Sequence, residues 1–172
     1  TGENEVQIRG DTPKVMDQEI AYAQAAGLDY WAFVLYEDNS SMSIGLQLYL
    51  NSPRRADVGF CAITEAARWW KREQYRATLL RLATLIREPS YQRVLGDRPL
   101  IYVGFLDPEW VTENWGSPAK FKQAFTELRQ VLQQYGLGNP YLVCLDFSAE
   151  RGKEWAENLG LDAISSYTIA GG

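Results

Sequence analysis

Four short apolar runs in the chain each end in an acidic or hydroxyl-bearing cluster, and a helix-like stretch follows three of them. The runs are Tyr30 to Tyr36 before Glu37, Val58 to Ile63 before Thr64 and Glu65, Leu100 to Leu106 before Asp107, and Tyr141 to Leu145 before Asp146. Runs without charged residues are typical of strands buried on both faces of a parallel sheet. Ligands of open α/β sheets and of (β/α) barrels bind at the carboxyl ends of the strands, so these polar residues mark the candidate site.

The segments around these runs have helical periodicity. The spacing of apolar residues predicts helices over 13–26, 71–86, 117–134 and 148–159, and a last short strand over 161–165. Residues 43–50 fit a helix or a strand, and we favour a helix because parallel strands need a crossover. Asp107 and Pro108 indicate a turn.

Strands and helices that alternate in this way predict an α/β fold of parallel (β/α) repeats. The arrangement is either a partial or complete TIM-type barrel or a doubly wound open parallel sheet, since both alternate strands and helices at this length. We expect one (β/α)-repeat domain across residues 1–172, either complete in itself or a segment of a larger barrel.

Composition excludes several kinds of partner and chemistry. The net charge of −5 and the sequence pI of about 4.8 argue against a nucleic-acid partner, which requires clustered Lys and Arg. No run approaches the roughly 18 apolar residues of a membrane helix, so no membrane partner is expected. The absence of His excludes Ser-His-Asp and Cys-His catalysis and leaves proton transfer to carboxylates, Tyr or Lys.

Motifs for cofactors, metals and reactive thiols are not found either. Gly136 and Gly138 precede a strand instead of joining a strand to a helix, so no nucleotide cofactor is predicted. No EF-hand string occurs, and no metal is expected. Cys61 and Cys144 each lie inside a predicted strand, which indicates buried free thiols.

Several strings, in order along the chain, resemble glycoside hydrolase family 99-like proteins of the WbsX type. They are Gln18 to Ala23, Ala26 to Phe33, Gly59 to Glu65, Tyr91 with Gly96 to Tyr102, Asn139 to Val143, and Gly160 to Ser165. The resemblance implies a (β/α)8 barrel that acts on α-linked sugars, of which this chain would supply about five strands. It also implies a carbohydrate substrate or ligand, a secreted or extracellular protein and, as a further partner, the remainder of a larger chain.

The same resemblance places a catalytic carboxylate at Glu65, in a position that the family surrounds with Asn. This chain departs from the family there, because Ala66 to Trp70 contains no second acid. Glycosidic cleavage needs two carboxyl groups roughly 5 to 9 Å apart, one to protonate the leaving oxygen and one to act as base or nucleophile. Glu37 follows the neighbouring predicted strand, so we expect it to be the partner of Glu65.

Six further residues are candidates for substrate binding, and each has an ordinary structural alternative. They are Tyr36, Arg68, Trp69, Asp107, Asp146 and Tyr167. The tyrosines can bind sugar hydroxyls or pack in the core, and Trp69, like Trp70, can stack on a pyranose or pack at a helix start. Arg68 can hold a carboxylate or a sugar hydroxyl. Asp107 is otherwise a turn former, and Asp146 is otherwise an N-cap for the helix near Ser148.

Three functions therefore fit the sequence. The first is a glycoside hydrolase that cleaves an α-linked polysaccharide or glycan by carboxylate acid/base catalysis. The second is a non-catalytic carbohydrate-binding module that lacks the second acid. The third is a structural segment of a larger carbohydrate-active enzyme, whose edge strands need further strands or a partner chain.

Overall fold

The computed structural model describes residues 10–167. The chain divides by its internal contacts into two compact units, one with residues up to Trp31 and Tyr36–Gly59, the other with Ala32–Leu35 and the chain from Phe60 onward. Strand β1, Tyr30–Val34, has residues in both units. The expectation of one domain across 1–172 therefore stays a prediction, and each unit is described by itself.

The first unit is built on two helices in contact, α1 (Pro13–Ala25) and α2 (Ile44–Asn51), with a 3₁₀ turn, η1 (Ser41–Ser43), before α2. Both predicted helices are confirmed. Thr12 caps α1 by accepting a hydrogen bond from the Val15 N–H at 3.3 Å. Ser52 Oγ donates to Asp17 at 2.5 Å and joins the end of α2 to α1.

The second unit contains a sheet and the helices that follow its strands. Its elements are β2 (Gly59–Glu65), α3 (Ala66–Trp69), α4 (Tyr75–Ile86), β3 (Arg93–Val94), β4 (Arg98–Gly104), α5 (Pro108–Trp115), α6 (Pro118–Gln134), β5 (Tyr141–Asp146), α7 (Ala149–Leu159) and β6 (Ala163–Ser166). The predicted helices over 71–86, 117–134 and 148–159 correspond to α4, α6 and α7. The turn expected at Asp107 and Pro108 is instead the start of α5.

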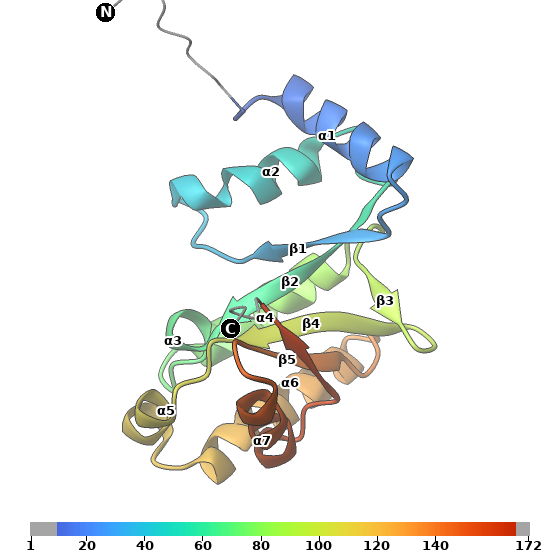
Figure 1. The fold of residues 1–172 in the computed structure, drawn as a ribbon. Helices are drawn as coiled ribbons and strands as arrows, with labels where there is room; N and C mark the ends of the chain where they lie inside the picture. Colours follow the sequence, from blue (N-terminus) through green and yellow to red (C-terminus); the bar gives the residue numbers. More distant parts are fainter. Residues whose placement is uncertain (1–9, 168–172) are drawn as a thin grey trace, which may run out of the picture. The chain divides into compact units, whose positions relative to one another are not determined.

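The strand order is β1-β2-β4-β5-β6, and the colours of Figure 1 run along the sequence from blue to red in the same order. The two-residue β3 pairs antiparallel with β4 and lies off this path. Strands β2, β4, β5 and β6 pair in parallel. A doubly wound sheet reverses its order at a switch point, whereas here each crossover moves on in the same direction. The prediction of parallel (β/α) repeats in a partial TIM-type fold is therefore confirmed.

Helices of the second unit pack on one face of this sheet and on each other. Helix α7 contacts β5 and β6, and α6 contacts α4, α5 and α7. A Cβ built on Gly152 of α7 would lie 3.5 Å from Asp146 Cβ and 3.9 Å from Ile164 Cβ, so these two side chains face the helices. Trp70 donates its indole N–H to Thr64 Oγ1 at 3.0 Å and packs on Phe125 of α6, so Thr64 faces the helices as well.

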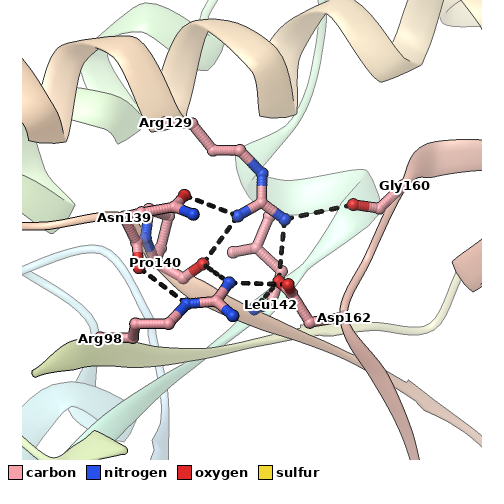
Figure 2. A network of polar contacts seen from close by, with 7 residues as sticks. All are labelled: Arg98, Arg129, Asn139, Pro140, Leu142, Gly160 and Asp162. Carbon is pink, nitrogen blue, oxygen red and sulfur yellow. Dashed lines mark hydrogen bonds and ion pairs between the residues drawn. The ribbon is translucent and has the colours of Figure 1, made fainter. Parts of the chain in front are cut away.

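The amino ends of β4 and β5 and the turn before β6 are joined by a polar network (Figure 2). Its centre is the Asp162 carboxylate, which binds Arg98 Nη2 at 2.6 Å, Arg129 Nη2 at 2.8 Å and the Leu142 N–H at 2.9 Å. Burial alone would raise the pKa of Asp162, but these hydrogen bonds outweigh it and lower the pKa. The guanidinium groups also donate to the carbonyl oxygens of Asn139, Pro140 and Gly160.

Both cysteines lie in the sheet as buried free thiols, as predicted. Burial raises the pKa of Cys61 and of Cys144 to about 12, so the reactive thiolate is scarce at neutral pH. Over residues 10–167, none of the helices has the length and apolar character needed to cross a bilayer.

Candidate functional site

Glu65 is the last residue of β2 and lies at the carboxyl end of the sheet. Its neighbour Thr64 faces the helices, so the alternation of a strand turns the Glu65 side chain to the opposite face. The side chain is 27% exposed, and Oε2 accepts a hydrogen bond from Arg68 Nε at 3.0 Å. A carboxylate that is held in place yet open to solvent can reach a ligand on this face.

Arg68 and the two tryptophans after it lie in or next to the short helix α3. Arg68 makes an ion pair with Glu65, with 33% of its own side chain exposed, and so positions the carboxylate. Trp69 is half-buried: its indole N–H donates to the Leu35 carbonyl at 2.9 Å, and the Arg81 guanidinium lies 4.6 Å from the ring centroid. Trp70 is fully buried, so of the two only Trp69 can contact a ligand.

Asp146, the last residue of β5, is turned toward α7 rather than toward the Glu65 face. Its side chain is 1% exposed, and Arg151 binds both carboxylate oxygens at 2.6 to 3.0 Å. Burial alone would raise the pKa of Asp146, but Arg151 and the Ser148 N–H outweigh it and lower the pKa. The N-cap of α7 is Ser148, whose Oγ accepts from the Arg151 N–H at 3.3 Å.

Asp107 follows β4 and caps helix α5. Its carboxylate accepts a hydrogen bond from the Trp110 N–H at 2.8 Å, and Pro108 occupies the first turn. The residue is exposed, so the cap contact leaves it open to solvent. Substrate binding by Asp107 stays a prediction.

Tyr36 and Glu37 begin the loop after β1 and belong to the first unit. The Glu37 carbonyl accepts from the Ser40 N–H at 2.9 Å, and the Asp38 carbonyl accepts from Gln47 at 2.9 Å. These contacts give the loop a defined backbone. The roles of Tyr36 and Glu37, including the pairing of Glu37 with Glu65, stay predictions.

Tyr167 follows β6 and lies in a group that the sequence did not single out. Its ring packs against Phe105, which follows β4, and Phe147, which follows β5; we call these three residues the aromatic cluster. The ring centroids are 5.4 Å apart for Phe105–Phe147, 5.4 Å for Phe105–Tyr167 and 5.8 Å for Phe147–Tyr167. Of the three, the sequence singled out only Tyr167, because Phe105 lies inside the predicted strand Leu100 to Leu106 and Phe147 comes after Asp146, the acid that drew attention there.

Strand register places Glu65 next to this cluster. The Glu65 Cα pairs with that of Gly104, Gly104 pairs with Leu145, and Leu145 pairs with Ser165. Phe105 therefore follows the residue of β4 that pairs with Glu65, and adjacent strands lie about 4.8 Å apart. Because Gly104 has no side chain, none separates Glu65 from Leu145 along this row.

A cofactor or metal would need ligands that converge. Within residues 10–167, no three or more Cys, Asp and Glu side chains are grouped so that they could hold a metal ion. The described side chains at the carboxyl end of the sheet include the carboxylates of Glu65 and Asp107, the Arg68 guanidinium and aromatic rings.

Comparisons of the sequence alone find no relative. No protein-family model matches the chain, and no curated protein matches it either.

Solved structures do resemble the fold. Two are of the GH99 endo-alpha-mannosidase from Bacteroides thetaiotaomicron. The structure in complex with bis-tris propane superposes with a TM-score of 0.69 at 14% identity, over 95% of this chain and 48% of that one. The other gives 0.68 at 14% identity, over 96% and 46%. The chain thus spans about half the length of these structures, and its fold is GH99-like, as the sequence resemblance implied.

Proposed function

We propose that this chain is a glycoside hydrolase-like domain that acts on an α-linked glycan through Glu65. The observation that carries the proposal is the position of Glu65: it ends a parallel strand, and Arg68 of the short helix α3 holds its carboxylate at 3.0 Å with 27% of the side chain exposed. In TIM-type enzymes, catalytic residues come from this end of the strands.

The GH99-like fold supports the choice of substrate class, because the similar solved structures are of an endo-alpha-mannosidase. Fold alone does not determine chemistry, so the proposal depends on Glu65. In a glycosidase this carboxyl group protonates the leaving oxygen, or acts as base or nucleophile at the anomeric carbon, while a second acid takes the other role. Glu37 is the partner predicted from the sequence.

The test is the release of reducing sugar from α-mannans, α-glucans and bacterial exopolysaccharides. We expect Glu65→Gln to lower the rate at least about 10³-fold, because an amide cannot exchange the proton that the reaction moves. Glu109→Gln is the matched control: Glu109 is an exposed acid in the first turn of α5, and its loss should leave the rate unchanged. An active parent whose rate survives Glu65→Gln would refute the role of Glu65.

A second function, carbohydrate binding without turnover, is favoured by the lack of an acid in Ala66 to Trp70. It predicts saturable glycan binding by the parent and by Glu65→Gln, with no sugar released by either. Release of sugar by the parent separates the two functions. Glu37→Gln then tests the predicted pair, because a hydrolase that uses it would lose activity in that variant as well.

A further inference from the structure

We infer that the aromatic cluster, Phe105, Phe147 and Tyr167, is a carbohydrate-binding platform that stacks on the apolar face of a pyranose ring next to Glu65. This inference rests on the proposed function, since it assigns the subsite where the glycan of that function binds. It concerns residues at the carboxyl ends of three consecutive strands of the second unit, β4, β5 and β6.

The backbone ladder continues past the strand ends and holds the three residues at one edge of the sheet. The Phe105 N–H donates to the Leu145 carbonyl at 3.2 Å, and the Tyr167 N–H donates to the Asp146 carbonyl at 3.1 Å. Phe147 directly follows Asp146 on the strand between them. The backbones of Phe105 and Tyr167 are thus held by the sheet itself, and sites that regular elements carry are more precise than sites on loops.

The backbone of Phe105 is strained in a way that brings its ring into the cluster. Val103 pairs with Thr64, which faces the helices, so Val103 faces them too. Side chains alternate along a strand, so in an extended strand Phe105, two residues later, would also face the helices. Its φ of 59° instead places it in the left-handed region, which is unfavourable for a non-glycine residue. Its ring stacks on Phe147 with an interplanar angle of 29°. Strain of this kind collects at functional sites.

Two rings of the cluster are much more exposed to solvent than the phenylalanine rings in the core of the same unit. Phe147 is 50% and Tyr167 55% exposed, whereas Phe121 and Phe125, the phenylalanines of α6, are at most 1% exposed. Flat apolar rings at this level of exposure offer a surface that a partly apolar ligand can cover.

A sugar ring has the chemistry to cover this surface. The axial C–H groups of a pyranose form an apolar face that packs on aromatic rings, while its hydroxyl groups bind polar side chains at the edge. The Tyr167 phenol can donate to or accept from such a hydroxyl. Phe105 directly follows Gly104, the residue that pairs with Glu65 on the adjacent strand, and adjacent strands lie about 4.8 Å apart. A glycan that covers the rings and reaches across one strand would therefore meet the Glu65 carboxylate.

The test measures binding of α-linked mannotetraose by calorimetry in the full chain carrying Glu65→Gln, which prevents turnover during the titration. Phe147→Ala and Tyr167→Ala should each weaken binding about tenfold, the value of one lost aromatic contact. Tyr167→Phe should lose less, because the ring remains. The matched control is Tyr135→Ala, which removes a ring of similar exposure, 49%, after the end of α6 and should leave the affinity unchanged.

Phe105→Gly separates binding from folding. Glycine accepts the left-handed backbone without strain, so the variant should keep its melting temperature within a few degrees and still bind about tenfold more weakly. Loss of affinity together with loss of the folded state in every cluster variant would assign the rings to the core and overturn the inference.

Two other outcomes overturn the inference and are distinct from each other. If the parent bearing Glu65→Gln binds the glycan and the ring variants bind equally well, the platform is wrong while the proposed function stands. If no α-linked glycan in the panel is bound or cleaved by any form of the chain, both fail. Sedimentation of Phe147→Ala adds a check: a changed oligomeric state without a change in affinity would assign the rings to contact between copies of the chain.

Discussion

The two ends of the strands in the second unit are built differently. At the amino ends, Asp162 binds two guanidinium groups and a backbone N–H, and the remaining donors of those arginines reach carbonyl oxygens (Figure 2). At the carboxyl ends, Phe105 has a strained backbone, Phe147 and Tyr167 are half-exposed, and the Glu65 side chain is 27% exposed. In TIM-type folds the first end serves stability and the second serves catalysis.

The difference indicates which end of the strands stabilises the fold and which end is free to bind a ligand. The amino end satisfies its charges inside the protein, so its side chains have little capacity left for a ligand. The carboxyl end keeps surface and strain that a ligand can use, at a cost in stability. The predictions below test this division, from the largest expected effect to the smallest.

The largest effect should come from Asp162→Ala. The substitution leaves Arg98, Arg129 and the Leu142 N–H without their shared acceptor, and we expect the free energy of unfolding to fall by about 3 kcal/mol. Urea denaturation measures the loss. The control is Glu157→Ala, which removes an exposed ion pair to Lys153 at 3.9 Å and should cost less than about 0.5 kcal/mol. If both substitutions lowered the free energy of unfolding equally, the amino-end network would not have the special role in stability that we assign to it.

A smaller, pH-dependent part of the same effect belongs to the Asp162 charge. The pKa of Asp162 is lowered in the folded state, so its contribution is complete above the unfolded pKa of about 3.9 and is lost as the pH falls through the folded pKa. Asp162→Asn should therefore flatten the fall in stability with pH below that value. Denaturation of the parent and the variant from pH 6 downward measures it; parallel curves would mean that the charge contributes nothing.

Next in size is the strain at Phe105. At this left-handed position Gly should be more stable than Ala by about 1 kcal/mol, the reverse of an ordinary strand. Thermal unfolding of Phe105→Gly and Phe105→Ala gives the difference. The same two substitutions at Ile164, an exposed residue of β6, provide the control, where Ala should be the more stable. If Ala were favoured at both positions, the carboxyl end would carry no strain.

Sequence reasoning predicted the elements that have strong local signals. The helices predicted over 13–26 and 117–134 agree with α1 and α6 to within a residue. Both begin with a local signal, a capping residue followed by proline, at Thr12 with Pro13 and at Ser117 with Pro118. Asp107 with Pro108 carries the same signal but was interpreted as a turn, so α5 was missed, although Glu109 in its first turn supported a helix.

The features of the candidate site that were missed depend on tertiary structure. The face of the sheet toward which Asp146 points follows from its contact with Gly152 and Arg151 of α7, and no local pattern determines that face. A left-handed backbone at Phe105 is equally unpredictable, because nothing in a Phe residue favours it. The strand order β1-β2-β4-β5-β6, which separates a TIM-type fold from a doubly wound sheet, is a long-range property as well.

The smallest effect concerns Asp107, the acid that follows β4 and also caps α5. Asp107→Ala should cost about 0.5 kcal/mol of stability through the lost bond to the Trp110 N–H, while Asp107→Asn should keep it, since an amide oxygen also accepts. If Asp107 only caps the helix, neither variant changes glycan affinity beyond the change in stability. If its charge binds substrate, Asp107→Asn weakens binding of α-linked mannotetraose in a fully stable protein. Calorimetry together with thermal unfolding of both variants thus decides whether the proposed binding surface at the carboxyl end extends from Glu65 and the aromatic cluster to this acid.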